Sequence, residues 1–315
     1  MTERLPSPEG VEAAANRISG EVTRTPLLPL ADGVWVKAEC LQQGGSFKLR
    51  GATNRLLQLS ADERARGVVA FSSGNHAQGV AIAAQKLGIA ATIVMPSDAP
   101  AVKRDGTLAA GARIVGYDRA TESREAIAAR IATESGAIVV PSFDDVDVIE
   151  GQGTVGVEIR AQLGRAPDAV LVPCGGGGLS GGIAVALRES RIYAVEPEGW
   201  DDMGRSLRAG AILPVEEPAP ATRCDALQTK LVSPLTYGAL RDSGTEGASV
   251  SEAEVEAAIR FAFSRLRLVV EPGGAVALAA WLAGKARPDG ETVIVLSGGN
   301  VEPRLYADIL AGSGS

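Results

Sequence analysis

Short apolar runs that are typical of β-strands alternate with helical runs along most of this 315-residue sequence. Residues 68–72 form one strand-like run, and an apolar, alanine-rich helical run follows at residues 75–87. Residues 169–173 form another, and the helical run after it extends to Arg188. Strands that are separated by helices assemble as βαβ units, in which the strands lie parallel. The pattern therefore predicts an α/β fold with mainly parallel sheets.

The remaining predicted elements continue this order to the end of the chain. Ser251 and Glu254 match a capping box, which predicts the start of a helix. Because no change in composition marks a linker, a second domain would be inserted into the first. We expect a large domain from residues 1–66 and 145–315 and a small domain at residues 67–144. The other predicted strands are residues 91–95, 114–116, 137–140, 192–195 and 291–296, and the other predicted helices are residues 99–110, 121–135, 149–163, 251–267, 273–286 and a last one ending near Ile309.

The charge balance argues against a nucleic-acid partner. The chain carries 31 Lys and Arg against 38 Asp and Glu, a net charge of −7, with 5 Phe, 4 Tyr and 3 Trp. We expect neither a basic surface that follows phosphates nor a platform for base stacking. Uncharged runs at residues 67–85 and 169–187 approach the length of a membrane helix, but polar residues or glycines interrupt them, so no membrane span is expected. The first six residues lack the apolar core of a signal peptide, which predicts a cytoplasmic protein.

Four consecutive glycines, Gly175 to Gly178, follow the predicted strand at residues 169–173 and precede a predicted helix. A glycine turn at a helix N-terminus binds phosphate through backbone N–H groups, because no side chain blocks the approach. The segment from Gly176 to Gly181 also fits G-x-G-x-x-G, and Glu196 lies at the end of the next strand. That spacing is typical of dinucleotide sites, so an NAD-dependent oxidoreductase is one alternative. The loop by itself predicts a phosphate but does not identify it.

Three further motifs narrow the identity of the phosphate. Residues 46–52 read Ser-Phe-Lys-Leu-Arg-Gly-Ala, residues 72–76 read Ser-Ser-Gly-Asn-His, and residues 297–300 read Ser-Gly-Gly-Asn. In this order, with the tetraglycine loop before the last, they resemble the family of serine/threonine dehydratases (threonine ammonia-lyases) and serine racemases, fold-type II enzymes that use pyridoxal 5′-phosphate (PLP). The resemblance extends from residue 25 to residue 301. Leu49 and His76 favour this branch over the cysteine synthases, in which Asp and Thr are expected.

The resemblance implies a tryptophan synthase β-like fold with two parallel-sheet, three-layer domains, and a homodimer. It assigns Lys48 to bind PLP covalently and to remove the Cα proton of the substrate, a task that a lowered pKa would assist. The glycine loop would hold the phosphate, Asn75 the phenolic oxygen and Ser297 the pyridine nitrogen. The expected cofactor-binding residues are therefore Phe47, Lys48, Asn75, Gly175, Gly176, Gly177, Gly178, Leu179 and Ser297.

The segment from Ser72 to His76 is expected to bind the carboxylate of the substrate. Its five members, Ser72, Ser73, Gly74, Asn75 and His76, lie where a strand gives way to a helix, so N–H groups and the helix dipole favour an anion. The resemblance places Ser73 opposite Lys48 across the cofactor, as a second catalytic residue. His76 is the only histidine of the chain, which excludes a Ser-His-Asp triad, and we expect it to have a structural role.

A cation site is expected just after the strand that contains Glu196. By resemblance its ligands are Glu196, the backbone carbonyl of Trp200 and Asp202, and oxygen ligands of this kind suit a hard divalent ion such as Mg²⁺, Mn²⁺ or Ca²⁺. The alternative interpretation is a solvated acidic loop without an ion.

The resemblance predicts a carbon–nitrogen lyase that converts a β-hydroxy L-amino acid, L-threonine or L-serine, to a 2-oxo acid and ammonia. A serine racemase, or a dehydratase for hydroxyaspartate or phenylserine, is the alternative within PLP chemistry. A non-catalytic amino-acid-binding regulator would leave Lys48 and Ser297 unexplained. Residues 224–229 and Gly273 depart from the family pattern and leave the substrate side chain open. A second substrate carboxylate would need an extra cation, for which Arg50 and Arg223 are the nearest candidates in sequence.

Overall fold

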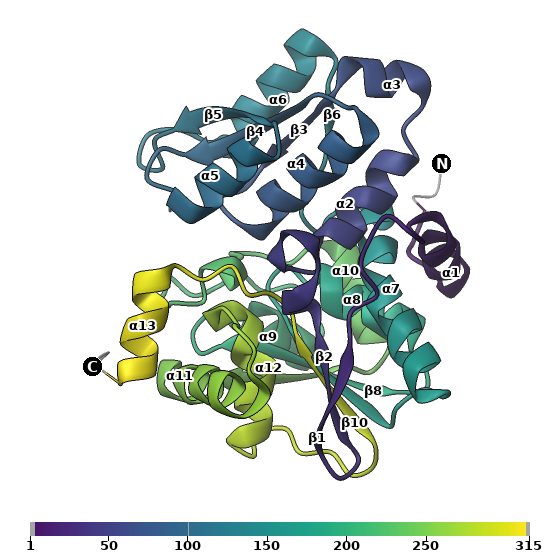
Figure 1. Ribbon diagram of the computed structural model, residues 1–315, viewed down its shortest axis with the longest axis vertical. Coiled ribbons are helices and arrows are strands. Elements are labelled where there is room, and N and C mark those ends of the chain that lie inside the picture. The colour runs from purple at the N-terminus through teal and green to yellow at the C-terminus, as the bar shows by residue number, and fades with distance from the viewer. Residues whose placement is uncertain (1–3, 100, 313–315) are drawn as a thin grey trace.

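The strands of the protein form two sheets, which Figure 1 shows in separate halves of the molecule. The computed structural model describes residues 4–99 and 101–312. The larger sheet has the order β1–β2–β10–β7–β8–β9, and only β1 runs antiparallel to its neighbour. The smaller sheet has four parallel strands in the order β5–β4–β3–β6. The strands are β1 Leu27–Ala31, β2 Val34–Ala38, β3 Val68–Phe71, β4 Ala91–Pro96, β5 Arg113–Tyr117, β6 Ile138–Val139, β7 Ala169–Pro173, β8 Arg191–Pro197, β9 Glu246–Val250 and β10 Thr292–Leu296.

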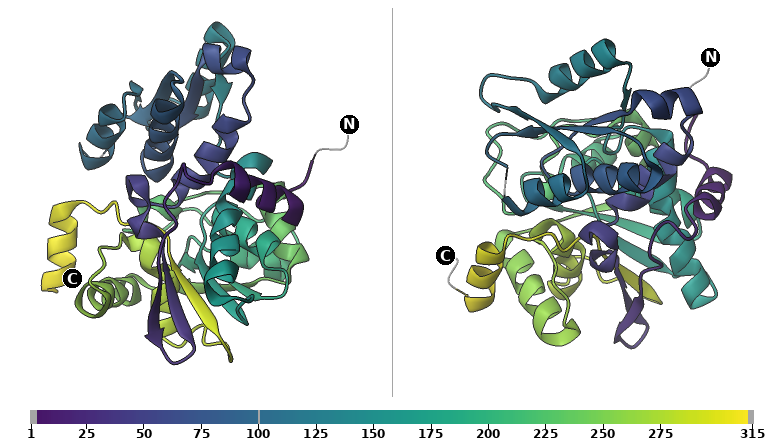
Figure 2. Two further views of the ribbon diagram at one scale, coloured as in Figure 1. Left: turned by 45° about the vertical axis from the view of Figure 1, so that its right-hand side comes forward. Right: turned by 45° about the horizontal axis from the view of Figure 1, so that its top comes forward.

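Helices lie in the connections between these strands, except in the tight turn from β1 to β2, and surround both sheets, as the two further views in Figure 2 show. Short 3₁₀ segments, η1 Glu39–Leu41, η2 Gln43–Gly45 and η3 Asp225–Leu227, and one π-helical segment, η4 Ala262–Leu266, occur in the connections. The α-helices are α1 Pro8–Arg17, α2 Lys48–Leu57, α3 Ala61–Arg66, α4 Asn75–Leu87, α5 Ala101–Ala109, α6 Arg124–Ser135, α7 Val146–Leu163, α8 Gly178–Ala186, α9 Asp202–Ala209, α10 Pro234–Asp242, α11 Glu252–Phe261, α12 Pro272–Leu282 and α13 Pro303–Ala311.

The smaller sheet is buried on both faces. Val68 of β3 packs in one core with Leu56 of α2, whereas Val69 packs in a second core with Ile127 of α6. Successive side chains of a strand point to opposite faces, so an uninterrupted apolar strand such as β3 needs helices on both sides. The result is a three-layer arrangement of helix, sheet and helix.

The larger sheet is layered in the same way. Val170 and Val172 of β7 pack with Ile183 of α8, and the intervening Leu171 packs with Val276 of α12. The predicted α/β fold with mainly parallel sheets is therefore confirmed. The sequence pattern did not reveal β1, β2 or β9, because Pro29 lies inside β1, Lys37 lies inside β2, and β9 begins with Glu246 and Gly247. No helix among the described residues is long and apolar enough to cross a membrane.

Several predicted elements begin or end where the sequence indicates. The capping box of Ser251 and Glu254 is formed at the start of α11. That helix ends at Phe261 and continues as the π-helical segment η4 rather than as a regular α-helix to Arg267, which instead adopts a φ of 61°. The predicted domain boundaries at residues 66/67 and 144/145 stay a prediction. Helix α2, which the prediction assigns to the large domain, contacts both α4 of the predicted small domain and α7 of the predicted large domain.

The carboxyl ends of four strands lie at the places where the chemical motifs occur. Ser72 follows β3, the glycine loop follows β7, Glu196 is the second-last residue of β8, and Ser297 follows β10. Parallel α/β sheets bind ligands at the carboxyl ends of their strands, because loops and helix N-termini converge there. We therefore expect the site at the carboxyl ends of the strands in both sheets.

Candidate active site

Lys48 is the first residue of α2, and backbone contacts fix the segment before it. The N–H of Phe47 donates to the carbonyl of Ser297 at 3.1 Å, and the N–H of Gly299 donates to the carbonyl of Gly45 at 2.8 Å. Ser46 and Gly298 form an antiparallel bridge between these two bonds. The first and last motifs of the chain are thereby joined at the end of β10.

The amine of Lys48 is held in a partly buried position. Nζ donates to the carbonyl of Ser142 at 2.8 Å and lies 5.2 Å from the centre of the Phe47 ring. Burial lowers the pKa of Lys48 to about 8, because desolvation disfavours the ammonium form. Near neutral pH a useful fraction of this amine is unprotonated, which suits both a covalent bond to an aldehyde and removal of a proton.

The glycine loop forms a cradle at the N-terminus of α8. A Cβ on Gly176 or Gly178 would overlap or crowd Phe143, and Gly177 has a φ of 84°, which favours glycine. The first turn of α8 has no side-chain cap, so its N–H groups are free to bind an anion. Phe143 directly follows Ser142, whose carbonyl accepts the hydrogen bond from Lys48. The amine and the cradle therefore both lie against the segment formed by Ser142 and Phe143.

The predicted carboxylate loop connects β3 to α4. The hydroxyl of Ser72 accepts a bond from the N–H of Gly74 at 3.1 Å, and Gly74 begins the helix without a side-chain cap. Ser73 is partly exposed, and its hydroxyl has no hydrogen bond within the described part of the chain. The uncapped start of a 13-residue helix is a suitable place for a carboxylate.

His76 is buried in the first turn of α4. Its Nε2 lies 2.8 Å from the carbonyl of Val140, so this nitrogen is the one that bears the hydrogen. Burial, and then the charge of Lys48, lower the pKa of His76 to about 3. The ring is therefore neutral at physiological pH and is poorly suited to act as an acid.

Asn75 connects the two halves of the site through polar contacts. Its Nδ2 donates to Glu271, and its Oδ1 accepts from Asn300 at 2.9 Å. Burial raises the pKa of Glu271 to about 7, and its second carboxylate oxygen has no partner among the described residues. The sequence singled out Gly273 of the same segment as a departure from the family pattern but not the carboxylate of Glu271, since an acidic residue before Pro272 also fits a simple helix start.

The two carboxylates of the predicted cation site are both buried. Glu196 accepts bonds from the N–H groups of Met203 at 3.0 Å and Gly204 at 2.8 Å, whereas neither Asp202 oxygen has a partner within the described chain. Burial raises the pKa of both acids, that of Asp202 to about 7. Orphaned buried carboxylate oxygens fit an oxygen-ligated cation. No cluster of three or more His, Cys, Asp or Glu side chains suited to a metal occurs among the described residues.

Neither arginine that the sequence offered as an extra cation is free. Arg50 is fully buried and pairs with Glu39 and Glu158. Arg223 pairs with Glu256. Both guanidinium groups therefore already pair with carboxylates of the protein, Arg50 inside the core and Arg223 at a partly exposed position, so neither is the free cation that the sequence suggested.

Comparisons with known proteins agree with this geometry. The chain is 40% identical over 320 residues to the L-threo-3-hydroxyaspartate ammonia-lyase of Saccharomyces cerevisiae, covering 98% of this chain and 97% of that protein. It is 41% identical over 283 residues to an L-threonine ammonia-lyase of Thermotoga maritima, covering 88% of this chain and 69% of that protein. The structure matches that of maize serine racemase with a TM-score of 0.91 at 34% identity, covering 98% of each chain.

The structural match confirms the expected tryptophan synthase β-like fold with two parallel-sheet domains. The dinucleotide alternative is wrong. Glu196, which would have to bind a ribose, is buried against the first turn of α9 and is occupied by two backbone N–H groups. The model of a protein family described as "Pyridoxal-phosphate dependent enzyme" matches residues 18–298. Because this match covers most of the chain and includes the lysine, the glycine cradle and the carboxylate loop, the protein belongs to the family of pyridoxal-phosphate dependent enzymes.

Proposed function

We propose that the protein removes water and ammonia from a β-hydroxy L-amino acid to yield a 2-oxo acid. The observation that carries this proposal is the partly buried amine of Lys48, whose pKa is lowered to about 8 and which shares a wall with an uncapped glycine cradle. PLP bound there supplies an electron sink for the charge that develops at Cα. Phe47 would pack beside the cofactor ring, Asn75 would bind its phenolic oxygen and Ser297 its pyridine nitrogen. The cradle of Gly175 to Leu179 would hold the phosphate, and the bond from the Phe47 N–H to the Ser297 carbonyl supports this grouping.

The side chains of the site divide the work between binding and proton transfer. Lys48 takes the Cα proton, since its amine is partly neutral near physiological pH. The N–H groups at the start of α4 bind the substrate carboxylate, and Ser72 stabilises that turn through its bond to Gly74. Ser73 offers a hydroxyl with no partner within the described chain, which suits a proton donor on the face opposite Lys48. The site combines residues from both sheets, so closure of the two halves would exclude water.

L-threonine and L-serine are the substrates that sequence reasoning favoured. The relatives widen the choice, because their names include a hydroxyaspartate ammonia-lyase, a threonine ammonia-lyase and a serine racemase. All three act on amino acids with a β-hydroxyl group. We keep β-elimination as the main reaction and racemisation as the alternative, and the substrate side chain depends on residues outside the lysine and the cradle.

Glu196, Asp202 and the carbonyl of Trp200 would hold a divalent cation, and the unpartnered oxygens of Asp202 support this assignment. A cation there would neutralise two buried acids and stabilise the turn that leads into α9. A homodimer and a cytoplasmic location stay predictions.

The experiment that tests the function combines a spectrum with peptide mapping. The purified protein should show a visible absorbance band that borohydride removes, and the reduced pyridoxyl group should map to Lys48. Lys48→Ala should lose the band and all 2-oxo acid formation from β-hydroxy amino acids. Lys86→Ala, at an exposed helix position, is the matched control and should keep both. A pyridoxyl group on another lysine, or no 2-oxo acid from any β-hydroxy amino acid, would contradict the proposal.

A further inference from the structure

Lys103 is a buried cation that the reaction described above does not use. It lies in helix α5, which connects β4 and β5 of the smaller sheet, and its side chain is only 6% exposed. Most of α5 faces solvent, and Lys103 and Thr107 are its buried residues. A buried ammonium group is costly unless a negative charge faces it, so the position of its partner is informative.

The amine of Lys103 lies beside the carboxylate loop. Its Nζ is 3.7 Å from the place that a Cβ on Gly74 would occupy. Gly74 immediately precedes the helix start that is expected to bind the substrate carboxylate. The amine is therefore a candidate partner for a second anionic group on a ligand whose carboxylate binds at this helix start.

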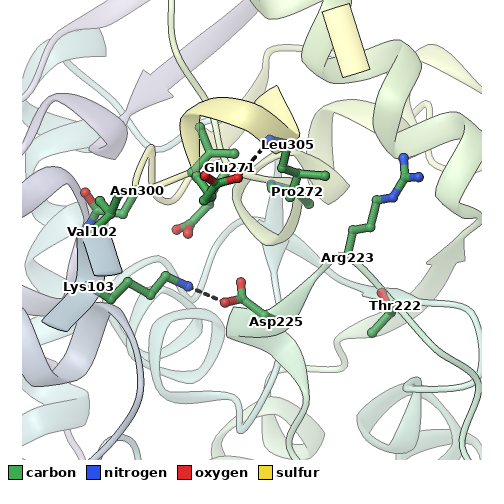
Figure 3. Close-up of a pocket in the computed structure, with 11 residues that line it drawn as sticks. Val102, Lys103, Thr222, Arg223, Asp225, Glu271, Pro272, Asn300 and Leu305 are labelled. Atoms are coloured by element: carbon green, nitrogen blue, oxygen red, sulfur yellow. Dashed lines mark hydrogen bonds and ion pairs between the residues drawn. The ribbon is translucent and has the colours of Figure 1, made fainter. Parts of the chain in front are cut away.

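The partner of Lys103 is Asp225, in η3 of the other half of the molecule, and Figure 3 shows the two side chains pointing toward each other. The two partners differ in burial, because the Asp225 side chain is 48% exposed. Both line a pocket of about 220 Å³ that also includes Glu271 and Asn300 of the candidate active site. The guanidinium of Arg223, which lines the same pocket, points away from the pair.

We propose that Lys103 is the binding residue for a second carboxylate on the substrate, which replaces Asp225 as its partner, so that the enzyme favours β-hydroxy dicarboxylic amino acids such as hydroxyaspartate. This inference rests on the proposed function and names its substrate class. It departs from the preference for L-threonine and L-serine that the motifs suggested.

The exchange of partners follows from the difference in exposure. Asp225 can turn into solvent at little cost, whereas the Lys103 nitrogen stays buried and needs a new negative partner. A substrate carboxylate attached to Cβ provides one, and a methyl or hydrogen at the same place does not. Glu271 also faces this region, and burial raises its pKa to about 7, so it opposes an incoming anion less than an ordinary carboxylate would.

The test uses the holoenzyme, two variants and one control. Lys103→Met removes the cation with little change in shape, and Asp225→Asn removes the competing anion. Arg104→Met, at the neighbouring exposed position of α5, is the control. We would measure kcat/KM for L-threo-3-hydroxyaspartate and L-serine, and binding of succinate by calorimetry. Succinate has the same carbon skeleton as aspartate and undergoes no elimination.

Lys103→Met should lower the kcat/KM ratio of hydroxyaspartate to L-serine by about tenfold or more and weaken succinate binding by a similar factor. Asp225→Asn should strengthen succinate binding several-fold, and Arg104→Met should change neither quantity. If Lys103 and Asp225 only connect the two halves, both variants will weaken succinate binding and leave the substrate ratio unchanged, which overturns the proposal. An equal loss on both substrates in Lys103→Met also overturns it.

The Asp225→Asn arm keeps the proposal testable if Lys103→Met does not fold, because Asp225 is half-exposed and its variant carries the opposite expectation. Failure of the proposed function can be distinguished from failure of the second-carboxylate site. A wild-type enzyme that forms no 2-oxo acid from any β-hydroxy amino acid contradicts the function, whereas the succinate measurements still decide whether the second-carboxylate site exists.

Discussion

Burial changes the acid–base behaviour of individual residues in opposite directions at this site. It lowers the pKa of Lys48 to about 8 and that of His76 to about 3, and it raises the pKa of Glu271 to about 7. In each case the neutral form is favoured, because a charge loses its hydration inside the protein. The site therefore combines a basic amine with a carboxyl group that can hold a proton near pH 7.

Glu271→Gln should change how stability depends on pH. The folded protein binds the Glu271 proton more tightly than the unfolded chain does, so this stabilisation is complete below about pH 4.5 and is lost as the pH rises through about 7. We expect the free energy of unfolding of the variant, relative to wild type, to rise by about 1–3 kcal/mol between pH 5 and pH 8. Urea unfolding at matched cofactor content measures this difference, and a constant difference across the range would contradict it.

Ser73→Ala should separate racemisation from elimination. Elimination needs only Lys48 to remove the Cα proton, whereas racemisation also needs a donor on the opposite face. We expect the variant to lose formation of the D-isomer and activity on D-substrates while it keeps much of the L-dehydratase rate. Formation of 2-oxo acid from each enantiomer provides the measurement. Loss of the L-activity as complete as in Lys48→Ala would show that Ser73 does not act on one face alone.

At the scale of elements, the helices that begin at the site lack side-chain caps. Helices α4 and α8 begin after Gly74 and Gly177, and neither has a capping side chain. Helices α1, α7 and α11, which begin elsewhere, are capped by Ser7, Asp145 and Ser251. Capping satisfies N–H groups at the first turn, so its absence leaves those groups for a ligand. Helices α4 and α8 therefore lack the stabilisation of a capping side chain at the places where anions are expected to bind.

Chelation should reveal whether the turn into α9 holds a cation. An ion that binds the folded state alone raises the melting temperature by mass action. We expect a chelator to lower the melting temperature of the wild type and added Mg²⁺, Mn²⁺ or Ca²⁺ to restore it. Asp202→Asn should abolish both effects, because the unpartnered oxygens of Asp202 are the expected ligands. Unchanged melting and activity after chelation would identify an ordinary acidic turn.

At the scale of the whole molecule, the candidate site depends on both sheets at once. Lys48 is joined to the end of β10 in the larger sheet, and Asn75 at the start of α4 reaches across to Glu271 and Asn300. The glycine cradle and the carboxylate loop belong to different sheets. A ligand that contacts all of them couples the stability of the two halves.

Removal of the cofactor should therefore lower the stability of the entire protein. We expect the apoprotein to melt at a lower temperature than the holoprotein, and re-addition of PLP to restore the transition, because PLP binds only the folded state. In Lys48→Ala the shift on adding PLP should be smaller, since the covalent link is lost. Scanning calorimetry of the apo and reconstituted forms measures this. Equal melting temperatures for both forms would contradict a site shared between the halves.

Most of the parallel strands, the helices between them and the motifs at the strand ends follow from the amino-acid sequence alone. These depend on local patterns, so the start of α4 at Asn75 and the capping box of α11 could be predicted from a few neighbouring residues. The edge strands β1 and β9 could not, because Pro29 inside β1 and Glu246 and Gly247 in β9 weaken the strand pattern. The resemblance of four motifs indicated the cofactor, but it did not identify the residues that contact the substrate side chain.

Contacts between residues that are far apart in the sequence depend on how the two sheets and their helices pack together. The pairing of Lys103 with Asp225 joins residues 122 positions apart, and that of Asn75 with Glu271 joins residues 196 apart. The order of strands and the placement of one sheet against the other create these contacts, and no local pattern encodes them. For the same reason Arg50, which sequence proximity favoured as an extra cation, lies in a buried ion-pair network, while Lys103 lies at the carboxylate loop.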